Sequence, residues 1–279
     1  MNATQAAPAS AFFLPGARGA RFCLFHAPAP DQPACGAFIY LHPFAEEMNC
    51  ARRIAAQQSR ALAALGFGVL QIDLFGCGDS DGEFSDADWA AWRDDASDAA
   101  DWLGAQGFER INLWGVRLGA LLALDVANRL DAEHLLLWQP TLNGKHALTQ
   151  FLRIALAGQA LGGSAVRFAD TGAMRAALAA GEMIEIAGYP LASALAADLD
   201  ALEAANLPAP RAQVHWLERS SEGLPLTAAS ERQLDRWRAA GTNAHGIALP
   251  GATAFWSTPG HTTAPEFNAA TAQLLAPPP

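Results

Sequence analysis

Residues 115–119 read G-V-R-L-G, which is the spacing of a nucleophile-presenting turn, G-x-S-x-G, with arginine in place of serine. The apolar run at 111–114 predicts a strand before this turn, and the run that starts at Ala120 predicts a helix after it, which is the context that such a turn requires. The glycines allow the backbone to pass close to its neighbours while the central side chain points outward. A guanidinium stays protonated and offers no lone pair to an acyl carbon, so Arg117 excludes serine chemistry here.

Arg117 can instead bind negative charge, because it presents several N–H donors at the start of a predicted helix, where the macrodipole favours anions. One interpretation is that it binds the carboxylate or phosphate of a ligand. The other is that it forms an internal ion pair with Glu46 or Glu47, which holds the cleft together. No serine or threonine between Gly115 and Leu130 offers a substitute nucleophile.

A second candidate segment follows the predicted strand at 37–41, where hydrolases with this kind of turn carry a loop that donates an N–H to an oxyanion. Phe44 in this loop and Leu118 after the turn are the expected backbone donors. His42 is either a residue that braces the loop or a base. Glu46 and Glu47 either favour the start of the following helix electrostatically or face Arg117, where one of them acts as general base for water.

The sequence offers a candidate for the acid of a catalytic triad but no histidine at the expected position. Glu218 follows the predicted strand at 213–217, which is the position for the acid, but the segment G-A-T-A-F-W at 251–256 occupies the position for the histidine. His261 comes several residues later, either brought back by a loop or incidental. Gln139, Lys145 and Gln150 come after the strand at 134–138, so they either line a ligand pocket with Arg117 or cap helices.

Short apolar runs alternate with longer helical patterns along the chain, which predicts a mostly parallel twisted sheet with helices on both faces. Residues 12–14 and 21–26 are expected to pair as antiparallel edge strands. We predict a single α/β domain over residues 1–279, with a cap-like helical insertion at about 141–190 where the strand rhythm lapses. The predicted strands lie at 37–41, 67–72, 111–114, 134–138, 213–217 and 244–249, and the predicted helices at 48–65, 89–103, 118–130, 228–240 and 265–275.

Composition narrows the classes of partner. The 279 residues are 51% apolar and carry a formal net charge of −10, which gives no broad positive field for nucleic acid or anionic lipid. No apolar run has the length of a membrane span or a signal peptide, so we expect a cytoplasmic protein. The four cysteines lack C-x-x-C spacing, and we expect neither a metal nor a cofactor. The sequence leaves open whether two copies form a homodimer.

Several segments together resemble the exosortase A system-associated hydrolases of the second type, a group within the α/β-hydrolase superfamily. The resemblance implies an α/β-hydrolase fold in a bacterial protein, encoded near the machinery for sorting proteins with a C-terminal PEP anchor and for exopolysaccharide production. It also implies that arginine at the turn is a trait of the group. The segments are P-F-A-E-E-M-N at 43–49, D-L-F-G-C-G-D-S at 73–80, G-V-R-L-G at 115–119, W-Q-P at 138–140 and T-Q-F-L-R at 149–153, with looser likeness at 188–190 and 255–256.

Two functions follow from these residues. The first is a hydrolase of an ester or acyl small molecule that works without a serine nucleophile, with Arg117 for electrostatic stabilisation and Glu46 or Glu47 as base. The second is a non-catalytic protein that uses the cleft to bind a small anionic molecule or a protein partner.

Overall fold

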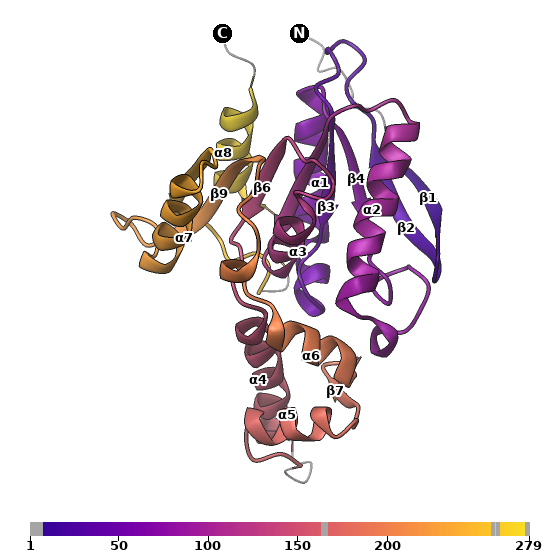
Figure 1. The fold of residues 1–279 in the computed structure, drawn as a ribbon, viewed down its shortest axis with the longest axis vertical. Coiled ribbons are helices and arrows are strands. Elements are labelled where there is room, and N and C mark those ends of the chain that lie inside the picture. Colours follow the sequence, from indigo (N-terminus) through magenta and orange to yellow (C-terminus); the bar gives the residue numbers. More distant parts are fainter. Residues whose placement is uncertain (1–7, 163–166, 258–259, 261–262, 277–279) are drawn as a thin grey trace.

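The computed structural model describes residues 8–162, 167–257, 260 and 263–276, and it contains an eight-stranded sheet in the order β1-β2-β4-β3-β5-β6-β9-β10 (Figure 1). The first two strands form an antiparallel ribbon, β2 pairs antiparallel with β4, and the other pairs are parallel. The strands are β1 (Ser10–Gly16), β2 (Gly19–His26), β3 (Ala37–Leu41), β4 (Gly68–Ile72), β5 (Ile111–Val116), β6 (His134–Trp138), β9 (Gln213–Ser220) and β10 (Ala244–Pro250).

Helices cover both faces of this sheet, and each face has its own apolar core. Strand residues alternate between the two: Ile39 packs with one core, and Phe38 and Tyr40 pack with the other. One face is covered by α2 (Trp89–Ala105), α3 (Leu118–Val126) and α7 (Ala228–Ala239), and the other by α1 (Glu46–Ala64) and α8 (Pro265–Leu275).

The chain between β6 and β9 forms a smaller group of elements. In Figure 1 these elements gather below one end of the sheet. They are α4 (Gly144–Gly162), α5 (Thr171–Ala179), β7 (Ile184–Ile186), β8 (Tyr189–Leu191), α6 (Ser193–Ala201) and the short 3₁₀ helix η2 (Ala204–Asn206), and a second short 3₁₀ helix, η1 (Phe84–Asp86), precedes α2. Strands β7 and β8 pair as an antiparallel hairpin.

Most predicted elements appear within a few residues of their expected bounds, and the antiparallel edge strands are confirmed. One helix is shorter than predicted: α3 ends at Val126, whereas the apolar pattern ran to residue 130. The backbone continues as turns, in which the N–H groups of Arg129 and Leu130 donate to the carbonyl of Val126. Asn128 in these turns bonds to the loop before β9, donating from Nδ2 to the carbonyl of Ala209 and accepting from the N–H of Arg211. Within the described residues, no helix is long and apolar enough to cross a membrane.

Candidate functional site

The turn between β5 and α3 has a backbone conformation that L-residues rarely adopt. Arg117 lies there with φ 56° and ψ −117°. A Cβ on Gly115 would approach Ala120 Cα to 2.4 Å, and a Cβ on Gly119 would approach the Leu41 carbonyl oxygen to 2.1 Å. Both flanking positions therefore require glycine, and the sharp turn presents the Arg117 side chain at the carboxyl end of the strand.

A similar turn starts α1 on the neighbouring strand. Ala45 lies at φ 51° and ψ −127°, and Glu46 and Glu47 follow it as the first residues of the helix. Because β3 and β5 are adjacent and parallel, these two helix starts lie at the same edge of the sheet. This arrangement brings the predicted acids to the predicted arginine.

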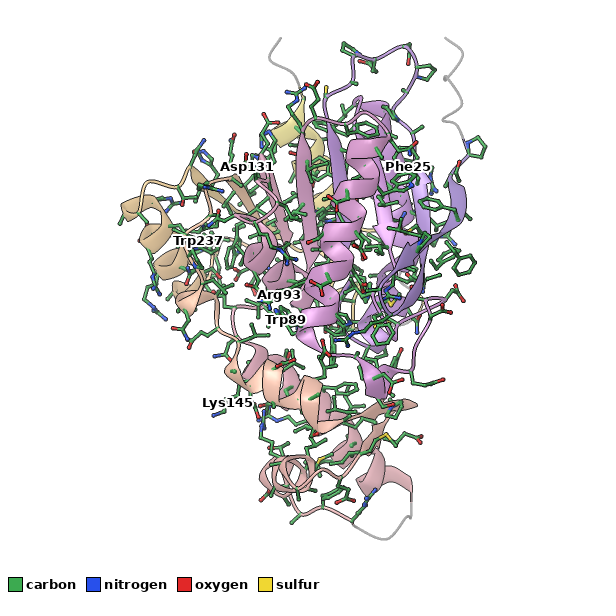
Figure 2. The ribbon with its side chains drawn as sticks, turned by 45° about the vertical axis from the view of Figure 1, so that its right-hand side comes forward. Phe25, Trp89, Arg93, Asp131, Lys145 and Trp237 are labelled. Carbon is green, nitrogen blue, oxygen red and sulfur yellow. The ribbon has the colours of Figure 1, made fainter. Side chains whose placement is uncertain are left out.

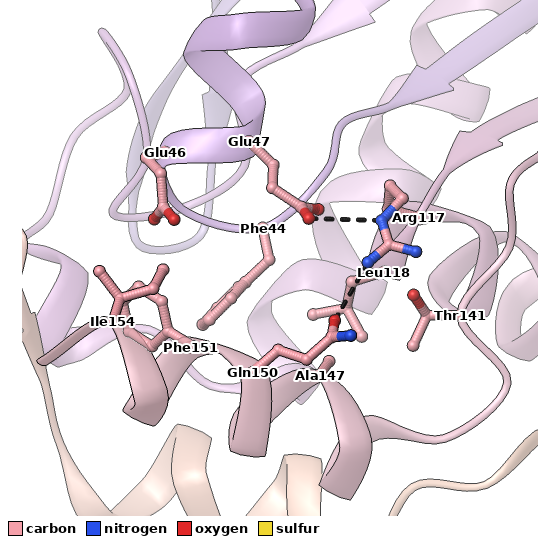
Figure 3. A pocket seen from close by; sticks show the side chains of 10 residues that line it. All are labelled: Phe44, Glu46, Glu47, Arg117, Leu118, Thr141, Ala147, Gln150, Phe151 and Ile154. Carbon is pink, nitrogen blue, oxygen red and sulfur yellow. Dashed lines mark hydrogen bonds and ion pairs between the residues drawn. The ribbon is translucent and has the colours of Figure 1, made fainter. Parts of the chain in front are cut away.

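Among the described residues the guanidinium of Arg117 has three partners, two of which are drawn in Figure 3. Its Nε lies 3.3 Å from Glu47 Oε1, and its Nη2 donates to Gln150 Oε1 at 3.1 Å. Its Cζ lies 5.3 Å from the ring centroid of Trp256, within the range of a cation–π contact. The ion pair is partly buried, with 16% of the Arg117 side chain and 23% of the Glu47 side chain exposed. The internal ion pair weighed for Arg117 is therefore present, and its partner is Glu47.

Burial raises the pKa of both carboxyl groups. The pKa of Glu47 is raised to about 7 by desolvation, against which the charge of Arg117 and its hydrogen bond act. The pKa of Glu46 is also raised by desolvation, while its own backbone N–H lowers it. Glu46 Oε2 is buried and has no hydrogen-bond partner in the part of the chain that the structure describes.

These side chains line a cleft with about 60 Å³ of free space that is partly open to solvent. Its wall is mixed: a charged group around Arg117 meets apolar side chains from the loop before α1 and from α4. The lining residues are Phe44, Glu46, Glu47, Arg117, Leu118, Thr141, Ala147, Gln150, Phe151 and Ile154. Phe44 and Leu118, the predicted oxyanion donors, thus both border the cleft, and Thr141 carries the one hydroxyl group among its lining residues.

A second, much narrower cavity, with about 10 Å³ of free space, shares Phe44 and Leu118 with the cleft. Its lining is almost entirely apolar, and it extends toward Trp89 and Trp92 on α2 and Leu122 on α3. This space holds about one water-sized group, so the body of any ligand has to lie in the Arg117 cleft itself.

His42 does not line the Arg117 cleft. Its Nε2 accepts from the N–H of Leu74 at 3.2 Å, so the proton lies on Nδ1, which donates to the Pro43 carbonyl oxygen at 2.7 Å. Burial lowers the pKa of this histidine, which favours the neutral ring. Both ring nitrogens are thus bonded to the backbone, and this geometry fits the bracing interpretation of His42 rather than a base.

Only one of the three predicted ligand-binding residues lines the cleft, namely Gln150. Gln139 links the ends of β6 and β9, because its Oε1 accepts from the N–H of Arg219 at 2.9 Å. The side chain of Lys145 is exposed and projects outward from α4 (Figure 2). The position of a polar residue after a strand was not enough to predict which way its side chain faces.

Glu218 lies at the predicted position near the end of β9 but faces α7. Its Oε2 accepts from Trp216 Nε1 at 3.0 Å and from the Ser230 hydroxyl, and its Oε1 accepts from the N–H of Thr227 at 3.3 Å. The side chain is buried among these donors and does not line the cleft. His261 lies outside the described residues.

The sequence did not point to several residues of the cleft. Trp256 contacts Arg117 from the segment after β10, the position where a triad histidine was sought, so its place in the chain was the available signal. Phe151 and Ile154 come from α4, one and four residues after Gln150, and a helical periodicity from Gln150 indicates a shared face with Ile154. Among the described residues, no group of three His, Cys, Asp or Glu side chains is arranged to hold a metal ion.

Solved structures of α/β hydrolases match 95% or more of this chain. Est1E from Butyrivibrio proteoclasticus, solved with ferulic acid, has a TM-score of 0.64 at 16% identity over 95% of this chain and 96% of that one. XC6422 from Xanthomonas campestris, an α/β serine hydrolase without a lid, has a TM-score of 0.57 at 16% identity over all of both chains. A soluble variant of monoglyceride lipase from Saccharomyces cerevisiae with a substrate analogue has a TM-score of 0.64 at 12% identity over 98% and 96%.

The predicted α/β-hydrolase fold is therefore confirmed. At these identities the likeness establishes the fold alone, and the chemistry of the cleft has to be argued from its own residues. The chain matches no family model and no curated protein sequence.

Proposed function

We propose that this chain uses the Arg117 cleft to bind a small acyl or carboxylate ligand without forming a covalent intermediate. The observation that carries the proposal is the side chain at the turn: the backbone is shaped to present a nucleophile, and it presents a guanidinium instead. Arg117 can donate to a carbonyl or carboxylate oxygen, and the apolar side chains of the same cleft can contact the rest of the ligand.

The partners of Arg117 shape this binding. Glu47 lies at Nε and Gln150 accepts from Nη2, both at the edge of the guanidinium, so a ligand oxygen can accept from Nη1 or replace one of these contacts. Gln150 is neutral and exposed, which makes it the contact that a ligand displaces at lower cost. In this proposal α4, α5 and α6 form a cap, and α4 closes the cleft.

Three of the segments that resemble the exosortase A system-associated hydrolases contribute to this one cleft. Phe44, Glu46 and Glu47 come from 43–49, Arg117 and Leu118 from 115–119, and Gln150 and Phe151 from 149–153. This convergence supports membership of that group and a role in its PEP-sorting and exopolysaccharide context. It also supports the cleft as the place where the group's function is carried out.

Calorimetric titration with straight-chain carboxylates and their methyl esters tests the binding function. We expect Arg117→Met to weaken binding at least about tenfold, since a charge-assisted hydrogen bond contributes about 1.5–3 kcal/mol. Arg232→Met is the matched control, because Arg232 is exposed on α7 and lines neither cavity. If no compound in the series binds the wild type, or if Arg117→Met binds equally well, the proposal fails.

A specific observation favours hydrolysis as a second candidate function. A carboxyl group whose pKa is raised to about 7 suits a general base at neutral pH, and Glu47 lies beside the group that would polarise the substrate. Glu47 would take a proton from a water molecule while the oxygen of that water adds to the ester carbonyl. The bond to the alkoxy group would then break, and Glu47 would return the proton to the departing alcohol. Arg117 would stabilise the oxyanion.

Turnover of nitrophenyl and methyl esters distinguishes the two functions. If the chain hydrolyses esters in this way, we expect the rate to rise with pH through about 7, to fall at least about 100-fold in Glu47→Gln, and to occur without an acyl-enzyme in the mass spectrum. Ligand binding without turnover supports the binding function alone. An acyl-enzyme would contradict both.

A further inference from the structure

Glu46 lies at the end of the cleft away from Arg117, with Phe44 between them (Figure 3). Its Oε2 is buried and lacks a hydrogen-bond partner among the described residues. A buried carboxylate oxygen without a donor is costly, and native proteins seldom leave one in that state. Glu46 lines the cleft although this oxygen is covered, so its carboxyl group is the acceptor that a donor group of a ligand would meet there.

The charges that line the cleft favour one kind of donor. Its ionisable groups are two carboxyls, Glu46 and Glu47, and one guanidinium, Arg117. The ion pair between Glu47 and Arg117 already matches one negative charge with the positive one. A simple carboxylate ligand adds a further negative charge beside Glu46, whereas a ligand that also carries an ammonium group balances it.

The wall between the two polar ends is apolar. Phe44 and Phe151 pack edge to face with ring centroids 4.9 Å apart, and Ile154 lies on the same side as Glu46. Such a wall accommodates methylene groups rather than further polar groups. The ligand body that fits is a short apolar chain with one polar group at each end.

We propose that the cleft selects ω-amino acyl compounds, whose carboxylate or acyl oxygen binds Arg117 and whose ammonium group binds Glu46. This inference rests on the proposed binding function and adds which group the ligand carries at its second end. Glu46 is a specificity-determining residue in it, while Arg117 holds the end that all acyl ligands share. A charge-assisted hydrogen bond in a partly buried site is worth about 1.5–3 kcal/mol, which corresponds to about 10- to 100-fold in affinity.

Calorimetric titration with hexanoate, 6-hydroxyhexanoate and 6-aminohexanoate tests this, with 4-aminobutanoate and 8-aminooctanoate to vary the length of the spacer. We expect the best ω-amino compound to bind the wild type at least about tenfold more tightly than hexanoate. Glu46→Gln should remove that preference and leave the affinity for hexanoate within about threefold. Glu185→Gln, which neutralises an exposed acid on β7, is the matched control and should keep the preference.

The possible outcomes distinguish a failure of this inference from a failure of the proposed binding function. If hexanoate binds and no ω-amino compound binds more tightly, the inference is overturned while the binding function stands. A preference that persists in Glu46→Gln, or a hydroxyl compound that binds as tightly as the amine, also overturns it. If no compound binds the wild type, the binding function itself fails. Thermal unfolding of Glu46→Gln, expected to match that of wild type, checks that the variant is folded.

Discussion

At the scale of the residue, the position of Arg117 is energetically unfavourable in two ways. A non-glycine residue at φ 56° and ψ −117° carries strain of about 1–3 kcal/mol, and a cation at a helix N-terminus opposes the macrodipole. Glu47 offsets the second cost, because its carboxylate lies 3.3 Å from the guanidinium. Glu47 in turn is held in a partly buried place where its pKa is raised. The two residues are therefore best understood as one unit.

The pH dependence of stability should reveal this unit. The pKa of Glu47 is raised from 4.5 to about 7 in the folded state, so the folded protein binds more protons than the unfolded chain between these values. The contribution of Glu47 to the free energy of unfolding is thus fully present below about pH 4.5 and is lost as pH rises through 7. We expect wild type to lose stability relative to Glu47→Gln over this window, measured by urea denaturation of both proteins.

Asp95 titrates in an overlapping window, with a pKa raised to about 6, but it is present in both proteins and cancels in the difference. A difference in stability that does not change between pH 4.5 and 7 would show that Arg117 keeps Glu47 ionised throughout. The hydrolytic function would then lose the observation that favours it, while the binding function would be unaffected.

At the scale of the element, the start of α3 depends on the absence of side chains at two positions. Gly119 lies where a Cβ would meet the backbone oxygens of Leu41 and His42 at 2.1 and 2.5 Å. These oxygens belong to the end of β3 and the loop after it, so they cannot move without shifting the cleft. The helix, the strand and the loop of Phe44 are therefore held together by this close approach.

A pair of glycine substitutions tests this dependence. We expect Gly119→Ala to lower the free energy of unfolding by about 3 kcal/mol or more, because the added methyl group overlaps backbone. Gly158→Ala is the matched control: Gly158 lies in α4 with nothing within 4 Å of the added Cβ, so the change should stabilise by about 0.5–1 kcal/mol. Chemical denaturation measures both, and equal effects of the two substitutions would show that the approach at Gly119 is not tight.

The elements were largely predictable from sequence, but the cleft only in part. Strand and helix patterns, glycine spacing and position after a strand identified Arg117, Glu47 and Phe44, since these depend on local sequence and on the parallel sheet. Gln150 was also among the candidates for this cleft, but Trp256 approaches Arg117 from the segment after β10, and its direction depends on how that segment packs. The same limit explains Gln139, which faces β9.

At the scale of the whole molecule, a buried ion pair joins the antiparallel ribbon to the rest of the fold. Arg21 of β2 lies with its Nε 2.6 Å from Asp95 Oδ1 of α2, and both side chains are 2% exposed. Asp95 Oδ2 also accepts from the N–H of Phe75, and the guanidinium of Arg21 lies 4.7 Å from the centroid of the Phe75 ring. The ribbon, the loop after β4 and the long helix α2 thus meet at one charged centre.

Removing only one of these two charges should destabilise the folded protein. We expect Asp95→Asn and Arg21→Met each to lower the free energy of unfolding by about 3 kcal/mol, because each leaves an uncompensated buried charge. The double variant buries no charge, so its cost should be smaller than the sum of the single costs by about 2 kcal/mol.

The exposed pair Arg211 and Asp131, with 68% and 90% of the side chains exposed, should show a coupling below about 0.5 kcal/mol in the same urea experiment. Additive costs at Arg21 and Asp95 would mean that each is stabilised by its backbone partners, and that the ribbon is attached through its strand pairing with β4 rather than through this pair.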